Sequence, residues 1–158
     1  MNPMVMYEQE YGLIVKVIER LVREANAKTV FLVDKNGQLI ANAGEVENLD
    51  TTSLASLTAG NIAATGGLAK LIGEKEFSIL FHEGERDHLH ISNVGQRVIL
   101  VVIFDRRATL GLVRLRVKKA SEELEQIFDR LMKKVHAPGA QPLFTEISDE
   151  DIDNLFSD

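Results

Sequence analysis

The chain has 158 residues, and its composition of 45% hydrophobic and 27% charged residues is ordinary for a globular domain with an appendage. It contains no cysteine, which excludes disulfides, thiol nucleophiles and thiolate metal sites. The N-terminal residues lack a basic stretch followed by an apolar run, and no apolar segment reaches the ~18 residues of a membrane span. We therefore expect a cytoplasmic protein that makes no membrane contact.

The net charge of −6 is concentrated at one end of the chain. Residues 136–158 contain six acidic side chains and no lysine or arginine, which leaves 18 acidic and 18 basic residues in the remainder. A neutral body with an acidic end indicates a separate arm. We expect a domain over residues 1–135, a linker over 136–146 and an acidic amphipathic segment over 147–158.

Apolar periodicity predicts a first helix over residues 5–26. Two apolar runs then flank Asn36-Gly37, the dipeptide typical of a type I′ turn, in which both central residues need positive φ. The sequence therefore predicts an antiparallel hairpin of strands 30–34 and 38–43. A helix follows over residues 51–73, with Asp50 as its N-cap.

Three further strands are expected over residues 78–84, 88–94 and 97–104. The last is apolar on both faces, so we place it at the centre of the sheet, covered on both sides. A long helix over residues 110–135 ends the domain. Its apolar spacing of 3 and 4 suits a coiled coil as well as packing on the sheet, and we favour the sheet.

The element order is α-β-β-α-β-β-β-α. The fold class it predicts is α/β of the α+β type, a single five-stranded antiparallel sheet with helices on both faces. A C-terminal acidic tail follows the domain.

The helix over residues 51–73 has one unusual side. On a helical wheel, one arc is mainly apolar and is expected to face the sheet; it comprises Leu54, Leu57, Asn61, Ile62, Thr65, Leu68 and Ile72. We call the opposite arc the small-residue face; it comprises Thr52, Ala55, Ser56, Ala59, Gly60, Ala63, Gly66, Gly67 and Lys70. Three glycines inside a helix cost about 1 kcal/mol each relative to alanine. The face either packs tightly against the protein's own first or last helix or forms an exposed platform, and we favour the platform.

Several stretches carry a resemblance to a known family. The segment DTTSLASLTAGNIAATGGLAKLIGE, together with VFLVDKNGQLIANAG, FHEGERDHLHI, LVVIFD and SDEDIDNLF, resembles the roadblock/dynein light-chain family. Within that family the chain is similar to the bacterial MglB branch. The resemblance covers nearly the whole chain and implies a roadblock-like sheet sandwiched by helices.

The resemblance also implies a function. Members of the branch are homodimers in which the central helices lie antiparallel and the third strands pair. They bind an MglA-type small Ras-like GTPase and accelerate GTP hydrolysis without inserting an arginine finger, because contact with the platform brings the GTPase's own catalytic residues into place. We therefore expect a GTPase activator in bacterial polarity or motility, with concentration at a cell pole as a further expectation. The alternative is a scaffold that binds the GTPase without changing turnover.

This interpretation assigns no catalytic residue to the chain, no metal site and no cofactor; nucleotide and magnesium would belong to the GTPase. All nine residues of the small-residue face are the candidate site for the second copy and the GTPase. We expect Ala59, Ala63, Gly66 and Gly67 at the centre of the GTPase contact and Lys70 near its rim.

Other constellations have weaker support. His82, His88 and His90 lie close together on two strands and suggest a metal site, but strand histidines are more often ordinary surface residues. No G-x-x-x-x-G-K-[ST] loop is present, so the chain does not look like the GTPase itself.

Arg106 and Arg107 follow the expected central strand, where an arginine can reach a phosphate, but a solvated turn is the preferred interpretation. With four further cations they form a basic belt; these are Arg114, Arg116, Lys118 and Lys119. The belt has no interleaved aromatics, so no nucleic-acid partner is expected. Binding of the acidic tail by the belt is an alternative use.

The tail has two interpretations. It is either a disordered, solubilising end or a short helix, capped by Ser148, that docks on a partner, in first place the same GTPase. The docking residues would be Ile147, Ile152, Leu155 and Phe156.

Overall fold

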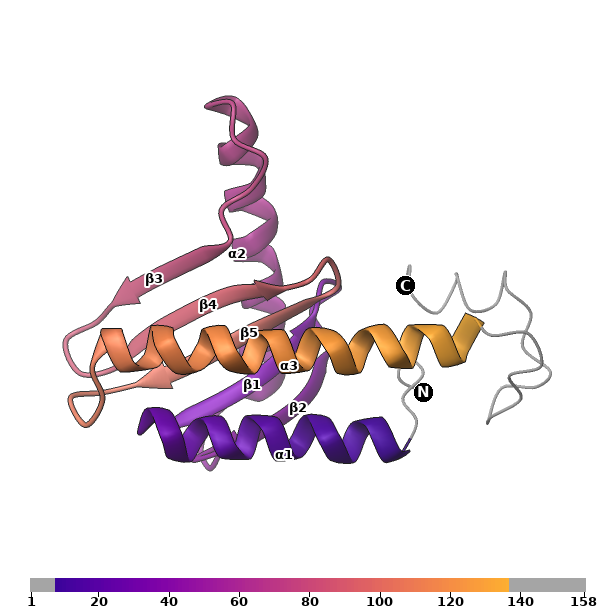
Figure 1. Cartoon of the computed structure of the whole chain (residues 1–158). Helices are drawn as coiled ribbons and strands as arrows, with labels where there is room; N and C mark the ends of the chain where they lie inside the picture. The colour runs from indigo at the N-terminus through magenta and orange to yellow at the C-terminus, as the bar shows by residue number, and fades with distance from the viewer. Residues whose placement is uncertain (1–7, 137–158) are drawn as a thin grey trace.

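A five-stranded antiparallel sheet separates two helical layers of unequal size (Figure 1). The structure is a computed structural model that describes residues 8–136. Along the chain it contains α1 (Glu8–Ala25), β1 (Thr29–Asp34), β2 (Leu39–Gly44), α2 (Thr51–Leu71), β3 (Ile79–Glu83), β4 (His88–Val94), β5 (Val98–Phe104) and α3 (Leu110–His136). The predicted order and fold class are confirmed. The tail residues lie outside the described range, as does the predicted linker apart from His136.

The strand order is β2-β1-β5-β4-β3, and every neighbouring pair is antiparallel. The predicted central position of the last strand is confirmed, because β5 pairs with β1 on one side and β4 on the other and is buried at all seven positions. A sheet with this order leaves β2 and β3 as its edges.

Alternating residues of the strands supply two separate cores. One face packs against α1 and α3, which lie side by side across it (Figure 1), through β1 and β5 residues such as Val30, Leu32 and Val102. The apolar seam of α3 belongs to this core. The prediction that this helix packs against the sheet, and does not form a coiled coil, is therefore confirmed. The opposite face, with Phe31 and Val101, packs against α2.

The hairpin between β1 and β2 forms, but its turn differs from the prediction. Only Gly37 of the Asn36-Gly37 pair has positive φ, at +91°, so a type I′ turn is excluded. The Gly37 N–H donates to the Asp34 carbonyl at 3.0 Å, and the Asp34 carboxylate accepts from the N–H groups of Asn36 and Gln38. These hydrogen bonds to the Asp34 carboxylate stabilise a turn that is longer than two residues.

The predicted orientation of α2 is wrong in part. Leu57 is 71% exposed, and Leu68 and Ile72 are also exposed, although these residues were expected to face the sheet. The helix instead contacts the sheet layer through the buried Ala55 and Thr58, with Leu54 and Ile62 partly buried beside them. Small residues let the helix approach the sheet closely, and the bulky side chains stay outside.

Candidate partner-binding site

Both ends of α2 are fixed by hydrogen bonds, which holds its exposed faces in place. At the N-terminus the Asp50 carboxylate accepts from the Ser53 N–H at 3.0 Å and from the Ser53 hydroxyl at 2.7 Å, and these bonds lower the pKa of Asp50. At the C-terminus Gly73 has φ of +84°, and the Glu74 N–H donates to the Ala69 carbonyl at 2.9 Å. This Schellman-type end turns the chain towards β3.

Most of the small-residue face is accessible in the protomer. Six of its members are exposed, namely Thr52, Ser56, Gly60, Ala63, Gly67 and Lys70. Ala59 and Gly66 are half-buried. Ala55 is only 1% exposed and packs in the core below α2, so its inclusion among partner-contacting residues is wrong.

The helical glycines of this face are not required by the protomer. A Cβ atom added to Gly60, Gly66 or Gly67 would meet no neighbouring atom within 4 Å. The protein's own first and last helices do not cover them either, because α1 and α3 lie on the other face of the sheet (Figure 1). Nothing among residues 8–136 of the protomer therefore explains the helix-weakening cost of these glycines.

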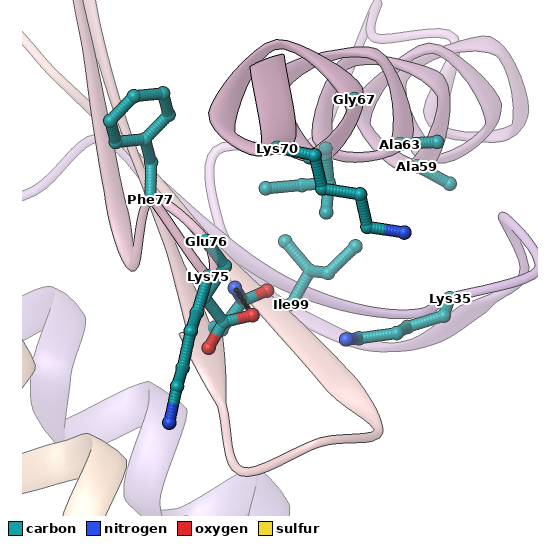
Figure 2. A pocket seen from close by; sticks show the side chains of 12 residues that line it. Lys35, Ala59, Ala63, Gly67, Lys70, Lys75, Glu76, Phe77 and Ile99 are labelled. Carbon is teal, nitrogen blue, oxygen red and sulfur yellow. Dashed lines mark hydrogen bonds between the residues drawn. The ribbon is translucent and has the colours of Figure 1, made fainter. Parts of the chain in front are cut away.

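A cavity of about 440 Å³ opens beside the C-terminal half of the small-residue face (Figure 2). Ala59, Ala63, Gly66, Gly67 and Lys70 all line it, so the structure brings together the residues predicted for the centre and rim of the GTPase contact. The opposite wall comes from other elements, and it includes Ile99, Lys35, Asn93 and the segment Lys75–Phe77.

The charges around this cavity are mainly positive. Lys35, Lys70 and Lys75 line it, and among the described residues Glu76 is the only acidic one in the lining. Figure 2 shows Lys35 and Lys70 extending over the same side of the cavity, whereas Lys75 points away from both. Asn93 donates to Glu76 at 3.5 Å. An anionic group at the mouth would meet two ammonium groups.

Sequence reasoning missed Lys35 as a member of this site. The hairpin turn reaches α2, since a Cβ atom added to Gly37 would lie only 3.2 Å from Ser56 Cα. Lys35 is therefore carried to the small-residue face by a turn that is distant in sequence. The Asn-Gly signal located the turn, but no local pattern indicates which helix the turn approaches.

A second exposed surface on α2 is strongly apolar. We call it the apolar flank; it comprises Leu57, Leu68, Leu71 and Ile72, with exposed fractions of 71%, 57%, 83% and 65%. The edge strand β3 adds Ile79 and Phe81, which are 45% and 39% exposed. The Nε2 atom of His82 in β3 lies 3.3 Å from the Nδ2 atom of Asn61 in α2, and this contact links the strand to the helix. Apolar surface of this extent on one helix is typical of a protein contact.

The three strand histidines have separate environments. His88 accepts a hydrogen bond from the Gly84 N–H and contacts the rings of Phe81 and Phe104, which also stack on each other. His90 is 1% exposed, and neither of its ring nitrogens has a partner within the described structure. Burial lowers the pKa of His90, and the positive charge of Arg114 lowers it further. Among residues 8–136, no group of three or more acidic or histidine side chains could hold a metal ion.

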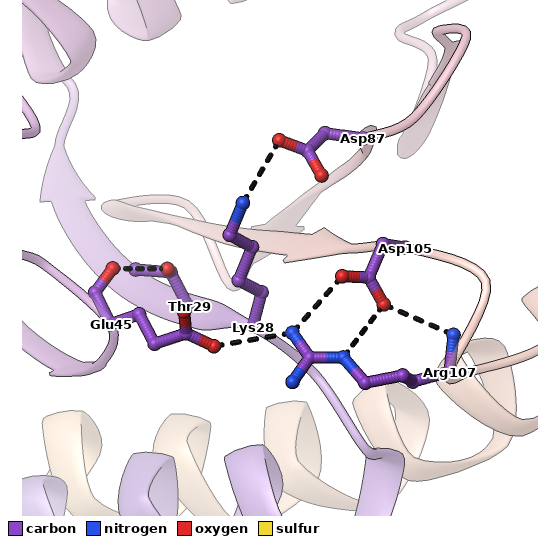
Figure 3. A network of polar contacts seen from close by, with 6 residues as sticks. All are labelled: Lys28, Thr29, Glu45, Asp87, Asp105 and Arg107. Carbon is purple, nitrogen blue, oxygen red and sulfur yellow. Dashed lines mark hydrogen bonds and ion pairs between the residues drawn. The ribbon is translucent and has the colours of Figure 1, made fainter.

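Arg106 and Arg107 lie in an exposed turn before α3, as the preferred interpretation expected, and Arg107 also takes part in a surface network (Figure 3). Its guanidinium donates to Asp105 at 3.0 Å and to Glu45 at 3.2 Å, while Arg106 is exposed. These hydrogen bonds with Arg107 lower the pKa of Asp105 to about 2. The positive charge of Arg107 is therefore partly neutralised, which weakens its contribution to the basic belt.

A chain of this element order and sheet order has the roadblock fold. The chain belongs to the Roadblock/LC7 domain family, whose family model matches residues 13–104.

Within the family, the chain is similar to solved MglB structures. Myxococcus xanthus MglB is 67% identical, with a TM-score of 0.77 over 80% of this chain and 96% of that chain. The gliding protein MglB from Thermus thermophilus is 38% identical, with a TM-score of 0.76 over 80% and 96%. An MglB with a tetrameric arrangement is 37% identical, with a TM-score of 0.77 over 81% and 96%. The predicted branch is thereby confirmed.

No helix among residues 8–136 is both long enough and apolar enough to cross a membrane.

Proposed function

We propose that this protein is a GTPase-activating protein that, as a homodimer, binds an MglA-type small Ras-like GTPase and stimulates its GTP hydrolysis. The likeness to MglB structures supports the partner class, and the name of the Thermus relative supports a role in gliding or a related polarity process. The observation that carries the proposal is the small-residue face, whose glycines are not covered by any other part of the described protomer.

In this proposal the dimer uses the apolar flank and β3, whereas the sequence assigned the second copy to the small-residue face together with the GTPase. Burying the flank against a second copy removes large apolar side chains from water, at roughly 25 cal/mol for each Å². The open edge of β3 offers unpaired backbone groups to the same strand of the second copy. A contact of this kind is two-fold symmetric, so each copy buries the same surface.

The GTPase binds across the small-residue face, with Ala59, Ala63, Gly66 and Gly67 at the centre and Lys70 at the rim. Alanine and glycine side chains cannot transfer protons or stabilise a phosphoryl group, so the activator supplies shape and position. Its contact holds the switch regions so that the GTPase's own arginine and glutamine reach the productive geometry. The nucleotide and magnesium remain on the GTPase.

The test is GTP turnover by the organism's MglA-type GTPase, measured alone and with this protein. Stimulation is expected with the natural sequence and should be lost with Gly67→Arg, because a long side chain there blocks close approach. Gly111→Arg is the matched control, since Gly111 is also an exposed helical glycine with nothing within 4 Å of an added Cβ, but it lies on α3.

Three outcomes separate the alternatives. Stimulation that is lost with Gly67→Arg and kept with Gly111→Arg supports an activator that works through α2. Binding without stimulation identifies a scaffold. Equal stimulation by both variants removes the small-residue face from the mechanism.

A further inference from the structure

The small-residue face is one wall of a cavity rather than a flat platform. Its other wall includes Ile99 of the central strand, and Ile62 of α2 also lines it. The floor of the cavity is therefore apolar, with Ile62 partly buried against the core that holds the fully buried Ile99. The ammonium groups of Lys35 and Lys70 extend over one side (Figure 2). A volume of about 440 Å³ lies within the ~300–1,000 Å³ that pockets for bound groups usually have.

We propose that this cavity is a socket for one large apolar side chain of the partner GTPase, presented by a segment that also carries carboxylates. The apolar side chain packs onto Ile62, beside the fully buried Ile99, and the carboxylates contact Lys35 and Lys70. This inference rests on the proposed function. It adds the β1–β2 turn as a second part of the GTPase-binding site, and it assigns a chemical class to the bound segment.

Charge complementarity selects an acidic segment. Lys35 and Lys70 extend over the same side, and Glu76, the acidic lining residue within 8–136, already accepts a hydrogen bond from Asn93.

A second copy of this chain is a poorer occupant. In a two-fold contact centred on the cavity, the lysines of one copy would face the lysines of the other, which is unfavourable. The apolar flank offers a second copy an uncharged surface of four large side chains on another side of the same helix.

A free phosphate compound is also a poorer occupant. Phosphate sites usually use the N–H groups at a helix N-terminus, whereas this cavity lies beside the C-terminal half of α2, where carbonyl groups end the helix. Ala59, Ala63 and Gly67 also form a ledge of about 12 Å at 1.5 Å per residue. A ledge of that length suits an extended peptide backbone.

The test measures GTPase affinity by titration calorimetry for Lys35→Glu and Lys70→Glu, alone and combined. Each charge reversal should weaken binding at least tenfold, and the pair should also reduce the salt dependence of binding. Lys75→Glu is the matched control, because Lys75 lines the cavity but points away from the other two lysines (Figure 2). It should stay within threefold of the natural sequence.

Ala59→Leu tests the apolar part of the socket. Ala59 is half-buried and lines the cavity, so a leucine there would occupy the space meant for the entering side chain. We expect at least tenfold weaker binding, with dimerisation and thermal unfolding kept as checks on folding. Rescue of Lys35→Glu by a Glu→Lys or Asp→Lys change in the GTPase would identify the contacting carboxylate.

The outcomes distinguish the inference from the proposed function. If the natural protein stimulates the GTPase but Lys35→Glu, Lys70→Glu and Lys75→Glu all bind equally well, the socket is wrong and the activator stands. If the natural protein does not bind the GTPase, both the proposed function and the proposed binding of a GTPase segment in the cavity are wrong. Equal binding by Ala59→Leu overturns insertion of an apolar side chain.

Discussion

The Lys134 ammonium of α3 donates to the Glu10 carboxylate of α1 at 2.8 Å, and this pair joins helix ends that are 124 residues apart. The Glu10 side chain is 2% exposed, whereas that of Lys134 is 44% exposed. A buried carboxylate needs such a partner, since removing the cation leaves an uncompensated charge.

Lys134→Met should therefore destabilise the protein. We expect a loss of about 1–3 kcal/mol in the free energy of unfolding, below the ~3–5 kcal/mol of a fully buried pair because Lys134 is partly solvated. Denaturant titration measures this loss. Adding Glu10→Leu should restore most of the stability, because the buried charge is then gone; a double variant as unstable as the sum of the singles would contradict this account.

The exposed glycines of α2 should limit stability. Gly67→Ala adds a methyl group that meets nothing within 4 Å, so the free energy of unfolding should rise by about 0.5–1 kcal/mol. The measurement is denaturant unfolding at fixed protein concentration. Gly44→Ala provides the contrast: Gly44 has φ of +90°, and an added Cβ would lie 2.5 Å from the Lys28 carbonyl oxygen. That change should destabilise the protein strongly.

The apolar flank should control self-association. Leu68→Glu places a charge on a surface that we propose to be buried between two copies, so the variant should be monomeric at concentrations where the natural sequence is dimeric. Sedimentation velocity reads this out. Leu115→Glu is the matched control, because Leu115 of α3 is 62% exposed, similar to the 57% of Leu68. A monomeric Leu115→Glu variant would place the interface elsewhere.

His90 should make stability depend on pH. Its pKa in the folded protein lies below the ordinary 6.5, because burial and then Arg114 disfavour the imidazolium. A depressed pKa means weaker proton binding in the folded state, so the stabilisation is present above pH 6.5 and is lost as pH falls through the lower folded value. His90→Leu should flatten the decline in stability below pH 6.5. Parallel profiles for the two proteins would rule out His90 as the cause.

The acidic segment should contribute to partner binding. Residues 147–158 lie outside the described structure, and their docking on the GTPase stays a prediction from Ile147, Ile152, Leu155 and Phe156. Deleting residues 145–158 should weaken GTPase binding or lower turnover while leaving the unfolding transition of the domain unchanged. Unaltered affinity and turnover would favour the solubilising interpretation.

Elements with strong periodicity were predictable. The α3 seam and the uniformly apolar β5 both lie where their patterns placed them. A helix buried along one stripe and a strand buried on both faces each show a characteristic spacing of apolar residues in the sequence. The orientation of α2 was not predictable in the same way. Leu57 and Ile72 form an apolar arc whether they meet the protein's own sheet or a second chain, and hydrophobicity alone does not name the partner.

Only the part of the cavity lining that comes from α2 was predictable from the sequence. The residues on α2 share one helix face, so Ala63 and Lys70 could be grouped from their spacing. Lys35 and Ile99 reach the same cavity from a turn and a strand, and their proximity depends on how the hairpin bends towards α2. Such tertiary relationships leave no local trace in a single sequence.

The contrast between the glycines has a consequence for how this chain can change over generations. Gly44 is held by its backbone and by the Lys28 carbonyl, so any descendant that keeps this fold must keep it. Gly60, Gly66 and Gly67 face open space, and alanine there would improve the helix. A lineage that lost its binding partner would therefore be expected to accumulate alanines along α2, so their persistence or loss among descendants records whether the partnership was still under selection.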